Sequence, residues 1–257
     1  MLQAHSFLWH YLWVAPNLLL LVLAGLIWRR QLHKQFPVFL VFAVVIAIEQ
    51  LTVYAADVLP SVSATNWWYV FWAGLLAEAL VKFALIGEIF GSVFGLYPSV
   101  AKLGKLLISG VGVILVLLAA VVAAYTPKDN IYGIVSGAHV LELAIYLIEC
   151  GLILSLFLFA AYCKLDWSRP CFGIALGLGV SACVHLATWA LLANGNLSSR
   201  YRVSLDMLNM ATYHVCVLIW FYYLLFTPKK VPKPGGPAPP EHHLEVWNKE
   251  LERLLHQ

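Results

Sequence analysis

The chain has 257 residues, of which 62% are hydrophobic and 11% are charged, and its mean hydropathy is +0.83. In soluble domains roughly a quarter of the residues are charged, so this composition excludes an ordinary soluble protein and indicates an integral membrane protein. The formal net charge of +3 is small. The placement of basic residues in loops explains it, and no nucleic-acid partner is needed.

Apolar runs long enough to cross about 30 Å of hydrocarbon as helices recur along the chain. They predict seven membrane spans, at residues 7–28, 37–56, 67–94, 103–125, 134–162, 171–193 and 204–226. We therefore expect residues 1–227 to form an all-α, seven-transmembrane-helix bundle. A linker rich in Pro, Lys and Gly follows at 228–240, and a short amphipathic helix is predicted at 241–257.

The basic residues of the loops predict the orientation of these spans. When the loops are sorted alternately to the two sides, ten basic residues fall on one side, and the other side has only Lys128, Arg200 and Arg202. Cytoplasmic loops carry the excess of Lys and Arg in membrane proteins. The sequence therefore predicts an N-terminus outside the cell and a C-terminus in the cytoplasm.

The third predicted span is unusual because it carries Glu78, Lys82 and Glu88 within an apolar run. One charged residue at the bilayer centre costs about 2.5–3.5 kcal/mol on insertion scales. Three charges on one span are therefore expected to face protein or water rather than lipid. We interpret this span as the element around which the bundle is organised.

Ionisable residues on other spans fall at the same depth. Counting from the span ends at 1.5 Å per residue, those within roughly 6 Å of the midplane are Glu49, Glu78, Lys82, Glu149, His185 and His214. Such a layer predicts one internal ligand or proton site. Ionisable residues nearer the outer ends predict a route to the outside, and these are Asp57, His139, Glu142 and Asp206.

The sequence leaves the chemistry of this layer open. A structural network is one interpretation, because Glu78 and Lys82 have the i,i+4 spacing of an ion pair within a helix. A ligand- or proton-responsive site is another, because histidines change charge near neutral pH. A metal or redox site on His185, His214 and a carboxylate is a third. No HExxH, CxxC or GxSxG motif is present, so we assign no catalytic residue, metal ligand or cofactor. A retinal protein is excluded because the seventh span has no lysine.

The predicted tail helix has a regular apolar stripe, formed by Leu244, Trp247, Leu251 and Leu254. These residues repeat at three- and four-residue steps, but two heptads rarely hold a coiled coil alone. We therefore expect the stripe to dock on the bundle, on the membrane surface, on a second copy of the chain or on a cytoplasmic partner.

Four stretches of the sequence resemble a family of uncharacterised seven-transmembrane proteins that is abundant in Acidobacteria: RRQLHKQFPVFL, WWYVFWAGLLAEALVKFALIGEIFGSVFGLYPSVAKLG, LDWSRPCFGIALGLGVSA and HHLEVWNKELERLL. The resemblance covers nearly the whole chain and implies a multi-pass protein of a bacterial inner membrane. It supports Glu78 and Glu88 as positions of the family pattern. The family pattern has arginines after an acid on the fifth span, whereas this chain reads LELAIYLIEC there. The resemblance implies no activity.

The leading functional hypothesis from the sequence is a sensory or small-ligand-binding membrane protein. The midplane layer would receive the signal, and the tail helix would pass it to another protein or to a second copy. One alternative is an intramembrane metal-dependent enzyme or redox protein that uses His185 and His214. A further alternative is a proton or small-solute carrier that depends on Glu78.

Overall fold

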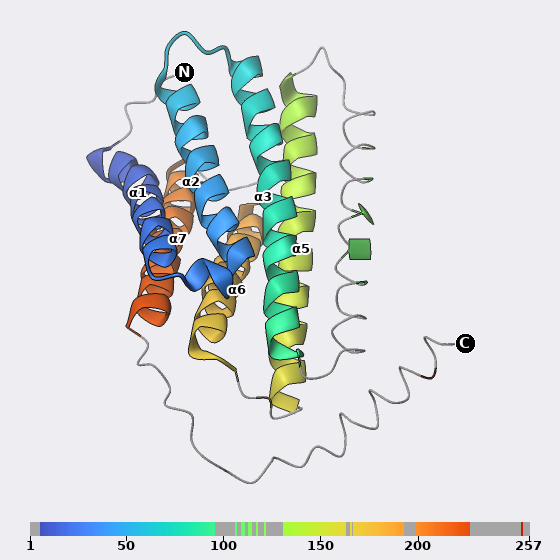
Figure 1. Cartoon of the computed structure of the whole chain (residues 1–257). Coiled ribbons are helices and arrows are strands. Elements are labelled where there is room, and N and C mark those ends of the chain that lie inside the picture. The colour runs from blue at the N-terminus through green and yellow to red at the C-terminus, as the bar shows by residue number, and fades with distance from the viewer. Residues whose placement is uncertain are drawn as a thin grey trace.

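The computed structural model describes residues 6–95, 131–162, 165, 167–192 and 199–226, together with single positions at 106, 109, 110, 113, 114, 117, 121 and 253. The elements formed by these residues are all helical: α1 (Phe7–Arg29), the 3₁₀ helix η1 (Leu32–Lys34), α2 (Pro37–Val58), α3 (Ala64–Val93), α5 (Ile131–Tyr162), α6 (Arg169–Leu192) and α7 (Ser199–Leu225). Six of the described helices are long and apolar enough to cross a membrane (Figure 1). The chain is therefore an all-α, multi-pass membrane protein.

The predicted spans match these six helices closely. The largest difference is at α7, which begins at Ser199 rather than at residue 204. Hydropathy detects only the apolar part of a helix, and the first turn of α7 contains the polar residues Arg200 and Arg202. The predicted span at 103–125 lies mainly outside the described residues, although its described positions are helical. The linker and the tail stripe of Leu244, Trp247, Leu251 and Leu254 also lie outside them.

The long helices form a closed ring. Going around it, α1 packs on α2, α2 on α3, α3 on α5, α5 on α6, α6 on α7, and α7 on α1 (Figure 1). α3 also contacts α6 across the ring. The interior is filled largely by apolar side chains such as Leu23, Phe39 and Leu85, which are fully buried. A closed ring provides an interior that lipid does not reach, and this is where charged side chains can be accommodated.

The outer face of the ring is apolar. Val22, Leu80, Leu147, Leu154 and Leu158 are each more than half exposed. A soluble protein rarely exposes so many large aliphatic side chains together. These side chains suit contact with the hydrocarbon of a bilayer, which agrees with the composition.

Close contact between α6 and α7 depends on glycine. A methyl group at Gly173 would collide with Tyr223, and one at Gly177 would collide with Trp220. Trp220 is itself held by Phe39 and Phe42, whose rings meet its indole edge to face. Glycine at these two positions therefore lets large aromatic side chains of α7 lie directly against the backbone of α6.

Glu88 joins α3 to the beginning of α2. The residue before α2 is Phe36, which provides no side-chain cap, and Pro37 opens the helix. The Glu88 carboxylate takes this role, because Oε1 accepts a hydrogen bond from the Val38 N–H at 2.9 Å and Oε2 accepts one from the Phe39 N–H at 3.0 Å. A negative charge is favourable at a helix N-terminus. This contact explains why an acid is present in an apolar span.

We expect Glu88→Ala to destabilise the bundle by about 1–3 kcal/mol, because backbone donors of α2 lose their partners. Glu88→Gln retains one acceptor oxygen and should lose less. Unfolding of the detergent-purified protein, followed by tryptophan fluorescence, measures the difference. An unchanged Glu88→Ala variant would contradict the capping role.

Candidate functional site

A buried lysine lies between two carboxylates inside the ring. The Lys82 Nζ of α3 is 2.8 Å from Glu78 Oε1, one turn earlier on the same helix, and 3.1 Å from Glu149 Oε2 on α5. Lys82 is 6% exposed and Glu149 is fully buried. The ion pair within α3 that the i,i+4 spacing predicts is confirmed. The pair with Glu149 joins α3 to α5.

Glu49 adds a third carboxyl group to this cluster. It reaches from α2 to the backbone of α3 at Gly74, where a methyl group would collide with its carboxylate. In this position it interacts electrostatically with both Glu78 and Lys82. Glu49 Oε2 and Glu149 Oε1 are buried without a hydrogen-bond partner among the described residues. Three carboxyl groups therefore lie around one ammonium group.

An aromatic side chain extends the cluster to α6. Lys82 Nζ lies 5.0 Å from the centre of the Tyr146 ring, a cation–π contact. The other neighbour of Tyr146 is His185, whose ring stacks on it with centroids 4.7 Å apart. His185 Nδ1 is 2.9 Å from the Ser181 carbonyl oxygen, which holds the imidazole in place. Lys82, Tyr146 and His185 thus form a continuous stack from α3 to α6.

Polar contacts between α1, α6 and α7 complete the interior. The Tyr213 hydroxyl donates to Asn17 Oδ1 at 3.1 Å, and Asn17 Nδ2 donates to the Trp13 carbonyl oxygen at 2.6 Å. One turn earlier on the same face of α7, the Thr188 hydroxyl is 3.0 Å from Asn209 Oδ1. These hydrogen bonds hold polar side chains of three helices in defined positions.

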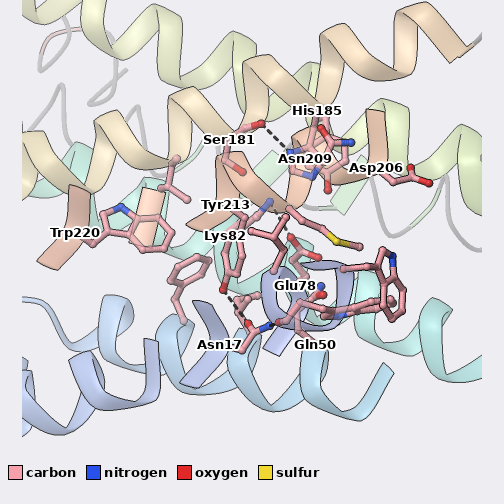
Figure 2. A pocket seen from close by; sticks show the side chains of 18 of the residues that line it. Asn17, Gln50, Glu78, Lys82, Ser181, His185, Asp206, Asn209, Tyr213 and Trp220 are labelled. Carbon is pink, nitrogen blue, oxygen red and sulfur yellow. Dashed lines mark hydrogen bonds and ion pairs between the residues drawn. The ribbon is translucent and has the colours of Figure 1, made fainter. Parts of the chain in front are cut away.

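These groups surround a cavity of about 380 Å³ (Figure 2). Its lining combines aliphatic, aromatic, polar and charged side chains, and consists of Trp9, Leu12, Trp13, Asn17, Phe42, Ile46, Gln50, Asp57, Glu78, Lys82, Tyr146, Leu178, Ser181, His185, Asp206, Asn209, Met210, Tyr213 and Trp220. Trp9, Asp57 and Asp206 lie toward the end of the ring at which α1 and α7 begin and α2 ends. Lys82 and Glu78 lie deeper, near Tyr213 and Asn17 (Figure 2).

Most of the predicted midplane residues meet at this cavity. Glu78, Lys82 and His185 line it, and Glu49 and Glu149 flank the same cluster. Of the residues predicted as an outer route, Asp57 and Asp206 also line the cavity. Glu142 is on α5 and is not among the lining residues, and the side chain of His139 lies outside the described part of the structure.

His214 is the exception. It is on α7, but its ring packs against Tyr11 of α1, with centroids 5.8 Å apart, and it does not line the cavity. His185 instead contacts Tyr146. Within the described residues, no three His, Cys, Asp or Glu side chains converge in a way that could hold a metal ion. The geometry of these residues gives no support to a metal site on both histidines.

Sequence reasoning did not place several lining residues in the site, among them Asn17, Gln50, Tyr146, Ser181, Asn209 and Tyr213. Neutral polar and aromatic side chains are common in membrane helices, and they carry no charge that would mark them. The sequence does mark Asn17, because it is the amide in an otherwise apolar stretch of the first span. In the structure its side chain is buried, with 1% exposed.

Comparisons with protein-family models, with curated proteins and with solved structures find no match to this chain. The cluster can hold charge inside the bundle, and the cavity beside it has the volume of a small-molecule site, since such pockets occupy roughly 300–1,000 Å³.

The ion pairs of Lys82 should dominate the stability of the interior. Lys82→Met leaves the Glu149 carboxylate buried without its partner, and breaking a buried pair in this way costs about 3–5 kcal/mol. The double variant Lys82→Met/Glu149→Gln removes both charges and should recover much of that loss. Unfolding in detergent measures all the variants. If the losses in free energy of unfolding of Lys82→Met and Glu149→Gln simply add up in the double variant, the two side chains do not interact directly.

Proposed function

We propose that this chain is a seven-helix membrane protein that binds a small ligand inside the bundle and responds to it as a sensor. In this proposal residues 103–125 form the remaining span, the N-terminus is outside and the C-terminus is in the cytoplasm. The ten-to-three distribution of basic residues supports this orientation. The resemblance to the seven-transmembrane family of Acidobacteria supports a bacterial inner membrane.

The observation that carries the proposal is the cavity of about 380 Å³ with Glu78 and Lys82 in its lining. Ligand sites are typically concave, with aromatic surfaces and a few fixed polar groups. This cavity has both, and its polar groups are held by hydrogen bonds such as that between Tyr213 and Asn17. A purely structural network would need the ion pairs but not an adjoining space lined by aromatic rings.

The arrangement of the lining also suits a response. A ligand in the cavity would touch each of the six long helices described, through residues such as Trp13, Gln50, Lys82, Tyr146, Ser181 and Asn209. A ligand shifts an equilibrium only if it binds two conformations differently, and contacts spread over all these helices are sensitive to their relative positions. In the proposal, the tail helix at 241–257 passes this change to a second copy or to a cytoplasmic partner.

Filling the cavity tests ligand binding. Met210 lines it from α7, whereas Leu218 on the same helix is 49% exposed on the outer face. The purified protein is screened with a panel of small amines, acids and neutral amphiphiles, with the unfolding temperature as readout. A ligand at about 100 times its Kd stabilises by about 2.7 kcal/mol.

We expect the screen to find compounds that raise the unfolding temperature of the natural chain and of the Leu218→Trp variant. The same compounds should not raise the unfolding temperature of Met210→Trp. The same shifts in all three proteins would place binding outside the cavity and contradict the proposed function.

A carrier is the second candidate, and the buried acceptor atoms of Glu49 and Glu149 favour it. A carboxyl group with a buried oxygen atom that has no hydrogen-bond partner can take up and release a proton along a pathway. This candidate predicts pH-dependent proton flux in liposomes that falls severalfold in Glu78→Gln. Flux that is equal to that of empty liposomes at every pH would leave the sensor as the supported function.

A further inference from the structure

Resting on the proposed ligand site, we propose that the cavity takes a small organic cation, an amine or a quaternary ammonium compound that carries an apolar group. The proposal depends on which charges the cavity offers to a ligand and on the aromatic rings beside them. Both are properties of the described lining residues.

The positive charge of the lining is already satisfied. Lys82 is the only Lys or Arg among the described lining residues. Its ammonium group contacts Glu78 at 2.8 Å and Glu149 at 3.1 Å, and it lies over the Tyr146 ring. An anionic ligand would have to displace one of these carboxylates from a buried ion pair, which is unfavourable.

Acidic side chains outnumber basic ones in the described lining. Asp57, Glu78 and Asp206 line the cavity, and Glu49 and Glu149 lie behind it. Asp206 is exposed near the end of the ring where α7 begins, so it can meet a ligand entering from that side. A cation entering the cavity can face carboxyl groups on α2, α3 and α7, and charges interact more strongly in a protein interior than in water.

Aromatic rings provide the second element of cation recognition. Trp9, Trp13 and Tyr213 line the cavity. Tyr146 lines it too, but its ring already lies between Lys82 and His185. The face of an indole or phenol ring attracts a cation, and quaternary ammonium ligands are recognised by such groups of rings. The ring centroids of Trp9 and Trp13 are 4.6 Å apart and the rings meet edge to face, so the two indoles form one aromatic surface of the lining.

The arrangement of the described side chains does not suit an inorganic cation. A metal ion needs several oxygen, nitrogen or sulfur ligands around one point. Among the described residues no three His, Cys, Asp or Glu side chains provide that arrangement. An organic cation needs no such cage, because its apolar part can pack on the rings while its charge faces a carboxylate.

The test compares three probes of similar shape on the whole chain purified in detergent: phenethylamine, 2-phenylethanol and phenylacetate. Isothermal titration calorimetry at neutral pH and low salt measures each affinity. We expect the amine to bind about tenfold more tightly than the alcohol, the factor that cation–π and charge contacts of this kind supply. Phenylacetate should bind more weakly than the alcohol.

The variant Asp206→Asn separates charge from shape. It should weaken the binding of phenethylamine by about two- to fivefold, as expected for an exposed charge pair, and leave the affinity for 2-phenylethanol unchanged. Asp206 is exposed, so the substitution should leave the fold intact, which the unfolding temperature checks. Met210→Trp should abolish binding of both probes and serves as the control for partition into detergent.

The outcomes distinguish a wrong ligand class from the absence of a ligand site. If the alcohol or the acid binds as tightly as the amine, and Met210→Trp abolishes that binding, the ligand class is wrong and the ligand site stands. If none of the three probes binds at millimolar concentration, or if Met210→Trp leaves their binding unchanged, the ligand class and the proposed function both fail.

Discussion

The ion pairs of Lys82 are the constraint on which the rest of this bundle depends. An ammonium group in the interior of a membrane protein needs carboxylate partners, and here they come from one turn earlier on α3 and from α5. The pairs orient α3 and α5 relative to each other, and the Tyr146 ring carries the contact on to His185 of α6. One charged side chain thus links three of the described helices.

The ring of helices and the cavity depend on each other. Helices that are apolar on both faces would pack together and leave no cavity between them. Here the inner faces bear fixed polar groups, such as the Asn17 and Tyr213 pair, which take up positions that aliphatic side chains would otherwise fill. Glycines on α6 have the opposite effect, because Gly173 and Gly177 admit aromatic side chains of α7 and close one side of the ring.

Two acidic side chains of α3 have different roles. Glu88 binds backbone N–H groups at the start of α2 and acts as a structural cap. Glu78 lies about 2.8 helical turns earlier, at about 3.6 residues per turn, pairs with Lys82 and faces the cavity. The two acids look alike in the sequence, but a cap uses both carboxylate oxygens within the protein, whereas Glu78 is part of the surface that a ligand would meet.

The sequence by itself determined the membrane class, the bounds of six helices to within one turn or so, and the ion pair of Glu78 and Lys82 within α3. Hydropathy and spacing are local properties, which explains why the Glu78 and Lys82 pair was predicted correctly. Only the tertiary structure decided that Glu149 and Glu49 join that pair, that His214 turns toward Tyr11 instead, and that Asn17 and Tyr146 line the same cavity. The reason is physical: depth along a span can be counted from the sequence, but the direction in which a side chain points depends on which helices become its neighbours.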